Sequence, residues 1–291
     1  MKKNYLLKIM AIVICVLLVG CESQNEVGEK KPTNVSSENI SNISMKAEIE
    51  EQVIADRKNV KITAKSINYD NRMGLEIKLL IENNSNENIA VDAVKLSIND
   101  IMLTSSLYEN VAPNKKANAS IRIDSSEFEL SKITEIKDIE FTIDVFNSDT
   151  WEDIFTEENI KIETNITNYT QKYNTEGSLV YNEKDIKIYV LKMSDEKSFF
   201  GSDVYVYIEN NSSKNITIEA EDVSVNGFMI DPAFMSDIGA GKKAYTLMSF
   251  MKSDLEENDI SNITSIELKF SGYDYNTWKD IFETEVLTIN F

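Results

Sequence analysis

The stretch LEIKLLIENNS, at residues 75–85, alternates apolar and charged side chains and ends in a polar Asn-Asn-Ser corner. An alternation of period two is typical of a β-strand with one buried face, and Asn and Ser are favoured in the turn that follows such a strand. The second part of the stretch, IENNS, returns unchanged at residues 208–212. The strand therefore belongs to a unit that the chain contains twice.

The repeat extends over most of the chain. The only two tryptophans, Trp151 and Trp278, lie 127 residues apart (278 − 151), and at this shift the Asp-Ile-Phe close behind each of them also coincides. Further upstream, residues 53–67 match residues 179–193 at a shift that is one residue shorter. The units of solenoids are much shorter, at about 20–50 residues, so this repeat indicates two copies of one domain.

We predict that the copies occupy residues 51–165 and 177–291 and are joined by a linker at residues 166–176. Each copy is expected to be an antiparallel β-sandwich, so that the whole chain is all-β, because its segments are short, rich in Ile, Val, Tyr and Phe, and separated by turn signals. Asn226-Gly227 is the strongest hairpin signal, and Asn99-Asp100 is its counterpart in the first copy.

Short helical segments are predicted at residues 125–131 and 253–258, where Ser opens an acidic stretch in each copy. Both segments lie at matching places in the repeat.

The N-terminus has the pattern of an export signal. Lys2, Lys3 and Lys8 precede an apolar run at residues 9–20, which is too short for a membrane-spanning helix of about 20 residues. The run ends in Leu-Val-Gly-Cys, which resembles the lipobox of bacterial lipoproteins. The resemblance implies that residues 1–20 are removed and that Cys21 carries a diacylglyceryl group, which anchors the chain at the extracellular face of the cell membrane. The alternative is an ordinary secretory signal with a chance cysteine.

Residues 21–50 are predicted to be a flexible tether, because this polar segment has too little apolar surface to offset the entropy of ordering it.

Composition excludes several classes of chemistry. The chain has no His, and its two cysteines, Cys15 and Cys21, both lie near the N-terminus. Catalysis that relies on His or on a Cys-His pair, zinc sites built on these residues, and disulfides within the domains are therefore excluded. The net charge of −19 argues against binding of nucleic acid, and we expect no cofactor.

The second copy is the richer in aromatic residues, and a ligand site is expected there. The candidate ligand-binding residues are Phe199, Phe200, Tyr205, Tyr207, Tyr273 and Tyr275. No metal site is expected. Four aspartates near the two tryptophans could supply oxygen ligands to Ca²⁺, although Asx-turns and strand-end capping explain them more simply: Asp149, Asp153, Asp274 and Asp280.

Trp151 and Trp278 are expected to be structural, with each ring packed on the edge of its sandwich; exposed stacking platforms for sugars are the alternative. The lysine pairs at residues 115–116 and 242–243 are expected to be solvated side chains that protect a sheet edge. Contact with an anionic wall polymer is the alternative for these lysines.

Four motifs shared by the copies resemble the immunoglobulin-like domains of uncharacterised lipoproteins of clostridia and their relatives. They are IENNS, the hairpins SIND and SVNG, the Lys-Lys-Ala turn and the stretch T-W-x-D-I-F. The resemblance covers about residues 51–291 and implies a fold and a location, but no activity.

The sequence thus favours a lipid-anchored surface protein that binds, adheres or acts as a spacer without catalysis. Its partner would be a wall component or a protein. A carboxylate-dependent envelope hydrolase resembling a glycosidase is the alternative, because such enzymes need only two acids. An accessory substrate-binding lipoprotein is a further alternative.

The repeat generates a test of modularity. Fragments of residues 48–165 and 177–291 are each expected to fold as β-rich domains and to be insensitive to reductant, because each has its own strands and turns and no cysteine. Circular dichroism and urea unfolding check this. Non-cooperative unfolding of either fragment, beside cooperative unfolding of the full chain, would contradict the two-domain organisation.

Overall fold

The computed structural model describes residues 46–194 and 201–291. The described chain is built from sheets whose strands pair antiparallel, with a single parallel pair, and from two short helices, and the predicted all-β fold is confirmed. Cys21, Phe199 and Phe200 lie outside the described residues. Within the described ranges, no helix is both long and apolar enough to span a membrane.

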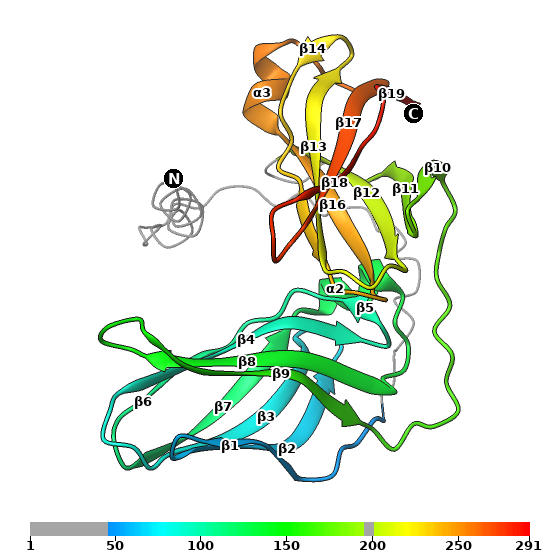
Figure 1. Cartoon of the computed structure of the whole chain (residues 1–291). Helices are drawn as coiled ribbons and strands as arrows, with labels where there is room; N and C mark the ends of the chain where they lie inside the picture. The colour runs from blue at the N-terminus through cyan, green and yellow to red at the C-terminus, as the bar shows by residue number, and fades with distance from the viewer. Residues whose placement is uncertain (1–45, 195–200) are drawn as a thin grey trace, which may run out of the picture. The chain divides into compact units, whose positions relative to one another are not determined.

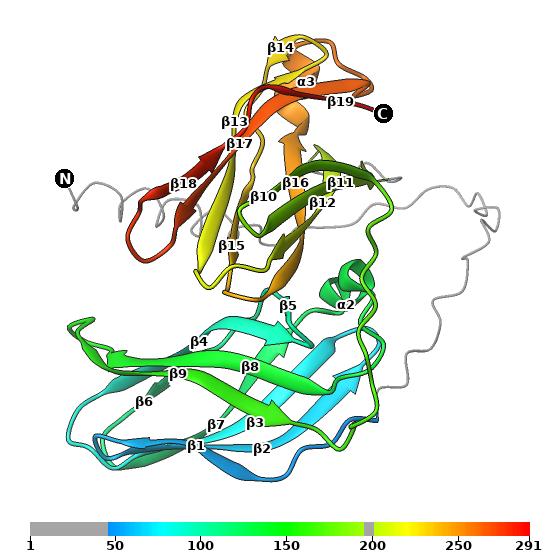
Figure 2. The ribbon, with the colours of Figure 1, turned by 45° about the vertical axis from the view of Figure 1, so that its right-hand side comes forward.

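The first copy consists of two facing layers of strands (Figures 1 and 2). The first layer contains β1 (Gln52–Arg57), β2 (Val60–Asp70), β3 (Gly74–Asn83) and β7 (Lys115–Ile123). The second layer contains β4 (Ile89–Ile98), β5 (Ile101–Met102), β6 (Tyr108–Val111), β8 (Asp138–Asn147) and β9 (Asp153–Glu163). Helix α2 (Ser125–Ser131) connects β7 to β8.

The second copy repeats this order of elements. One layer contains β10 (Ser178–Glu183), β11 (Ile186–Met193), β12 (Gly201–Asn210) and β16 (Lys243–Met251). The other contains β13 (Ile216–Val225), β14 (Phe228–Met229), β15 (Met235–Ile238), β17 (Ser265–Asp274), β18 (Asp280–Glu283) and β19 (Leu287–Asn290). Helix α3 (Lys252–Glu257) corresponds to α2, and β18 and β19 together correspond to β9.

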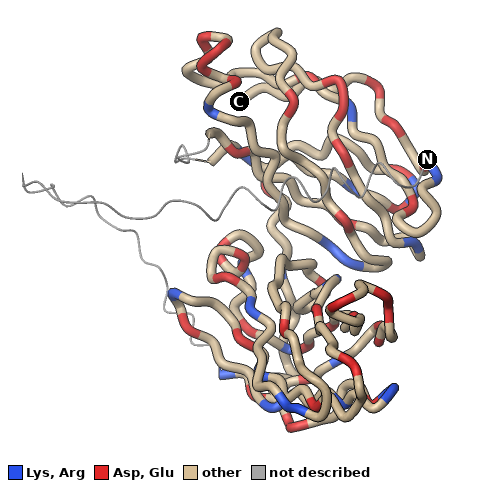
Figure 3. The backbone as a smooth tube through the Cα atoms, turned by 90° about the vertical axis from the view of Figure 1, so that its left-hand side faces the viewer, with Lys and Arg blue, Asp and Glu red and all other residues tan. Residues whose placement is uncertain are grey.

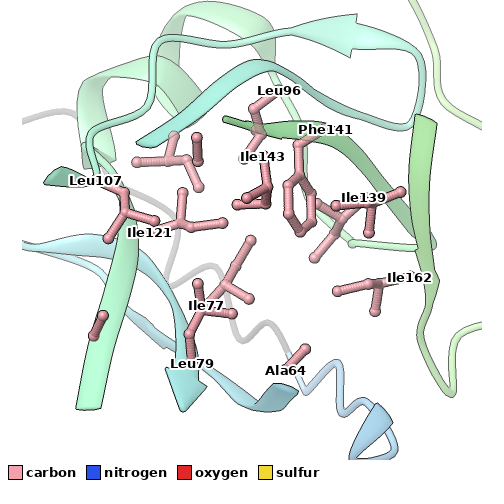
Figure 4. Packing of buried hydrophobic residues seen from close by; sticks show 14 of the residues in the cluster. Ala64, Ile77, Leu79, Leu96, Leu107, Ile121, Ile139, Phe141, Ile143 and Ile162 are labelled. Carbon is pink, nitrogen blue, oxygen red and sulfur yellow. The ribbon is translucent and has the colours of Figure 1, made fainter. Parts of the chain in front are cut away.

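The predicted alternation places the core between the layers. Leu75, Ile77, Leu79 and Ile81 of β3 all have exposed fractions of 1% or less. They face apolar residues of the opposite layer, including Phe141 of β8 (Figure 4). Burial of each such side chain contributes about 1.5–3 kcal/mol, so the core depends on keeping this alternation in register.

The hairpin signals are confirmed by the backbone. Asn226 and Gly227 have φ values of 50° and 88°, and Asn99 and Asp100 have values of 51° and 66°. Positive φ at both central residues is the condition for a type I′ turn, whose twist matches that of the flanking strands. The helix predicted at residues 125–131 is α2, but its N-cap is Asp124, which accepts a hydrogen bond from the Ser126 amide. The second predicted helix is α3, which begins at Lys252 and has no side-chain cap, so Ser does not cap either helix.

A fully buried asparagine closes the same corner of each copy. The side-chain amide of Asn83 donates to the carbonyl oxygens of Glu87 and Val111, at 2.8 and 2.9 Å, and its Oδ1 accepts from the Ser85 amide at 3.0 Å. Asn210 makes the equivalent bonds in the second copy. The IENNS motif is therefore repeated because its first Asn joins the end of one strand to a strand of the other layer.

The two copies also contact each other. The start of β16 pairs with β5 in parallel, through Lys243 with Ile101 and Ala244 with Met102. Tyr207 and Tyr245 of the second copy belong to the hydrophobic cluster of the first. The isolated fragment of residues 177–291 would expose both rings, so we expect it to be less stable than the same residues in the full chain.

The buried asparagine gives a sharp test. Asn83→Asp replaces the amide donor by a carboxylate that faces two carbonyl oxygens, and it is expected to destabilise the first copy by about 3 kcal/mol. Asn84→Asp is the matched control, since it makes the same charge change one residue away at an exposed side chain, and it should cost about 0.5 kcal/mol or less. Urea unfolding measures both. Equal losses would contradict the role given to Asn83.

Candidate functional site

The predicted aromatic residues of the second copy do not come together in one site. Tyr207 is fully buried, and its ring lies 4.6 Å from that of Tyr245. Tyr173 of the predicted linker and Tyr189 of β11 also contact Tyr207, with centroids at 6.2 and 5.8 Å. Tyr205 is half-buried on β12. Tyr207 is therefore a core residue, and its assignment as a ligand-binding residue is wrong.

Tyr275 and Tyr273 are closer to the surface. Tyr275 is 37% exposed, and the ammonium group of Lys95 lies 5.0 Å from its ring centroid. Tyr273 is half-buried, and its hydroxyl donates to Glu219 at 3.0 Å. Its counterpart in the first copy, 127 residues earlier, is also aromatic, Phe146. Tyr273 thus belongs to a feature that both copies share.

That shared feature is the turn that carries the tryptophan. The Trp151 amide donates to the carbonyl oxygen of Asn147, and the Trp278 amide donates to that of Asp274, both at 2.8 Å. The side-chain oxygens of Asn147 and Asp274 each accept two further backbone amides of their own turn. Side-chain oxygen and backbone together therefore fix one turn geometry in both copies, which accounts for the conserved spacing of the motif.

Both tryptophans are exposed, and the prediction that they are structural covers is wrong. Trp151 is 67% exposed and Trp278 is 68% exposed. Trp151 lies in the turn between β8 and β9, and Trp278 lies in the turn between β17 and β18. The sequence pattern located the turn before the last strand correctly, but local sequence does not determine on which side of that turn the indole lies.

Each indole stacks on an aromatic ring of the preceding strand. Trp151 lies 5.5 Å from Phe146 with an interplanar angle of 19°, and Trp278 lies 5.4 Å from Tyr273 at the same angle. Tyr108 of β6 adds a third ring in the first copy, 6.4 Å from Trp151. We call Trp151, Phe146 and Tyr108 the Trp151 platform, and Trp278 with Tyr273 the Trp278 platform.

The backbone at both tryptophans is strained. Their φ values, 63° for Trp151 and 59° for Trp278, lie in the left-handed region, where Gly is favoured and a bulky side chain costs about 1 kcal/mol or more. Burial of the side chain does little to offset this cost, because each Trp residue is about two thirds exposed. A bulky residue is thus held exposed at a strained position in both copies.

Carboxylates lie beside both platforms. Asp92 of β4 is the cross-strand partner of Tyr108 and also of Asp144, and burial together with the charge of Asp144 raises its pKa. In the second copy, burial and the hydrogen bond to Glu219 raise the pKa of Tyr273 to about 12. The Tyr273 hydroxyl therefore stays protonated at neutral pH and can donate a hydrogen bond.

The four aspartates considered for Ca²⁺ are not gathered into a site. Asp149 accepts a hydrogen bond from Asn88 at 2.9 Å, while Asp153 and Asp280 are exposed at the first positions of β9 and β18. Hydrogen bonds from Thr277 and Asn276 and the charge of nearby Lys214 hold the pKa of Asp274 below its usual value, although desolvation alone would raise it. The described residues contain no group of three acidic, His or Cys side chains able to hold a metal ion.

The lysine pair of the second copy is not a simple solvated pair, so that prediction is corrected for Lys242 and Lys243. The Lys242 side chain is only 13% exposed and lies 2.9 Å from both Asp100 and Glu140 of the first copy. The ammonium group of Lys243 lies 4.7 Å from the centroid of the Tyr173 ring. In the first copy, the lysines at positions 115 and 116 are exposed as predicted.

Comparisons with known proteins give no family. No family model and no curated protein matches the sequence. Among solved structures, the chain is similar to the YadV chaperone, at 12% identity over 80% of this chain and 100% of that one, with a TM-score of 0.26. Red sea bream transglutaminase is similar at 10% identity over 81% of this chain and 31% of that one, with a TM-score of 0.23.

A third structure, the Salmonella enterica SafA pilin in complex with the SafB chaperone, shows 9% identity over 74% of this chain and 89% of that one, with a TM-score of 0.19. Similarity at these scores carries no inference about what this chain binds or does.

The exposure of the tryptophans gives a test that separates a binding platform from a structural cover. Trp278→Gly relieves the left-handed strain and loses little buried area, so stability is expected to change by about 1 kcal/mol or less. Loss of a well-buried Trp would instead cost about 3–5 kcal/mol. Urea unfolding of the variant and of the parent chain measures the difference.

Fluorescence provides the second readout, because the chain has no other tryptophans. Native emission is expected to be red-shifted and readily quenched by acrylamide, a neutral quencher that the acidic chain does not repel. A blue-shifted, protected emission together with a large loss of stability would restore the structural role.

Proposed function

We propose that this chain is a non-catalytic binding protein held at the outer face of a cell membrane by a lipid on Cys21. The observation that carries the binding role is the exposed indole at the same strained turn of both copies. Aromatic residues with large accessible faces dominate the affinity of many binding sites, because a rigid ring gives contact area at a low entropic cost.

A pure spacer would not need these rings. A Gly at each Trp position would adopt the same backbone without strain, and an exposed Trp adds nothing to the distance between the membrane and the end of the chain. The strain is repeated in both copies, whereas the chain's other aromatic residues differ between them at several positions, such as Tyr205 and Tyr207 against Lys78 and Leu80. Binding therefore explains the turn better than spacing does.

The location rests on the sequence pattern at residues 1–21. A single acyl chain holds a protein only marginally at a membrane, whereas two chains hold it stably, and a diacylglyceryl cysteine supplies two. The acidic residues are spread along both copies (Figure 3). With a net charge of −19, the domains themselves would be repelled by anionic lipid. A covalent lipid at the end of a polar segment would hold the chain at the membrane without any contact between the acidic domains and the lipid.

Two cysteines make the anchoring testable with a matched control. Cys21→Ala is expected to abolish metabolic labelling of the protein by a fatty acid and to release or misprocess the chain, because the thioether cannot form. Cys15→Ala, six residues away in the same apolar run, should leave the labelling intact. The measurement is labelling followed by fractionation of cells and medium. Labelling that survives Cys21→Ala would remove the anchor from the proposal.

A further inference from the structure

The two platforms are small and flat, which restricts what they can bind. Each offers the face of one exposed indole, stacked at 19° on the ring below it. A stable protein interface needs about 800 Å² on each partner, far more than one indole face. A ligand that presents a flat, apolar face of ring size fits better. The C–H face of a pyranose sugar has this form.

Polar groups next to the rings match the hydroxyl groups of a sugar. In the first copy, Asp92 lies directly across from Tyr108 in the β4–β6 ladder. In the second copy, the corresponding carboxylate of Glu219 accepts a hydrogen bond from Tyr273, at the edge of the Trp278 platform. A carboxylate accepts hydrogen bonds from hydroxyl groups, and such charge-assisted bonds are stronger than neutral ones.

The first copy also has a hollow beside its platform. Its volume is about 290 Å³, and Tyr108 and Asp92 line it together with Ser106, Asn118 and Ser120. Tyr108 therefore faces both the hollow and the Trp151 ring. A sugar chain lying across Trp151 could place a neighbouring residue in this hollow, where hydroxyl and amide groups are available.

Charge decides which sugars suit the platforms. The carboxylates beside the rings and the net charge of −19 repel anionic polymers such as uronic acid chains, and Arg122, which also lines the hollow, is paired with Glu76. Two platforms on one chain suit a polymer whose units repeat, because binding of one unit raises the effective concentration of the next.

We infer that each platform binds a pyranose unit of a neutral polysaccharide through stacking on Trp151 or Trp278. This inference rests on the proposed binding function and names its ligand class. The second copy has Met235 at the position of Tyr108, so the Trp278 platform is the smaller of the two and should bind more weakly.

Affinity electrophoresis of the full chain tests the inference. The probes are hydroxyethyl cellulose, laminarin, galactomannan and soluble chitin oligomers, with polygalacturonate as the anionic comparison. At least one neutral probe is expected to retard the chain or to shift its Trp fluorescence, and polygalacturonate should do neither. If no neutral probe has an effect, or if polygalacturonate binds as well as they do, the inference is overturned.

Variants connect any binding to the platforms. Trp151→Ala should weaken binding roughly tenfold, Trp278→Ala should weaken it less, and the double variant should abolish it. Trp151→Phe should restore part of the affinity, because stacking needs only a flat ring. Phe228→Ala is the control, since Phe228 is an exposed aromatic residue outside both platforms. Binding unchanged in the double variant, or lost equally in the control, would overturn the assignment.

A final arm separates this inference from the proposed function. Washed envelopes of the organism that encodes the chain are treated with periodate, which destroys sugars, or with protease, and are then incubated with the parent chain and the double Trp variant. Trp-dependent binding that is lost only after periodate supports a glycan. Trp-dependent binding that is lost only after protease overturns the glycan while retaining the binding function. No Trp-dependent binding to untreated envelopes overturns both.

Discussion

The fold of each copy depends on one buried amide. Asn83 and Asn210 have no exposed surface, and each joins the end of a central strand to the turn that follows it and to the strand of the facing layer. An amide can do this because it both donates and accepts, so that the carbonyl groups at the corner are satisfied without water. The layers are thereby aligned at one end, and the alternating side chains of β3 and β12 point into the space between them. The platforms in turn depend on this alignment, since their turns are held by the strands of the second layer.

Much of this fold could be predicted from sequence because its signals are local. Period-two alternation located β3 and β12, and Asn-Gly located the hairpin of the second copy, since both patterns depend only on neighbouring residues.

Tyr207 was misassigned because its side chain faces away from the core of its own sandwich. The sequence of β12 predicts an exposed face there, but residues that are distant in sequence cover it. Lys242 was misassigned for the same reason, as its acidic partners lie more than a hundred positions earlier. The tryptophans were located correctly, but their exposure was not, because a motif repeated in two copies does not indicate whether its side chain is buried or exposed. Their left-handed backbone was likewise not indicated by any sequence signal.

The duplication serves as an internal comparison. Left-handed residues recur at matching sites in both copies: Lys58 and Lys184, Asn99 and Asn226, Asn114 and Gly241, Lys132 and Asp259, and Trp151 and Trp278. At most of these sites the side chain is one that tolerates positive φ or has a Gly counterpart, as expected when only the backbone matters. Two sites differ, because Lys58 with Lys184 and Trp151 with Trp278 are identical residues that do not favour positive φ. Of these two side chains, Trp is the bulkier and the less suited to the left-handed backbone.

The parallel contact between β16 and β5 joins unlike surfaces, the start of one sheet edge and the hairpin of another copy. In such a head-to-tail contact the two copies use different surfaces, so each copy retains the surface that its neighbour uses. In the first copy this surface is the start of β7, where Lys115 and Lys116 are exposed. In the second copy it is the hairpin of β14, where Phe228 and Met229 are exposed. Charged residues on a strand edge oppose the pairing of a further strand. The same two-lysine motif therefore has different surroundings in the two copies: Lys242 is paired with Asp100 and Glu140 across the joint, whereas Lys115 and Lys116 are exposed at the start of β7.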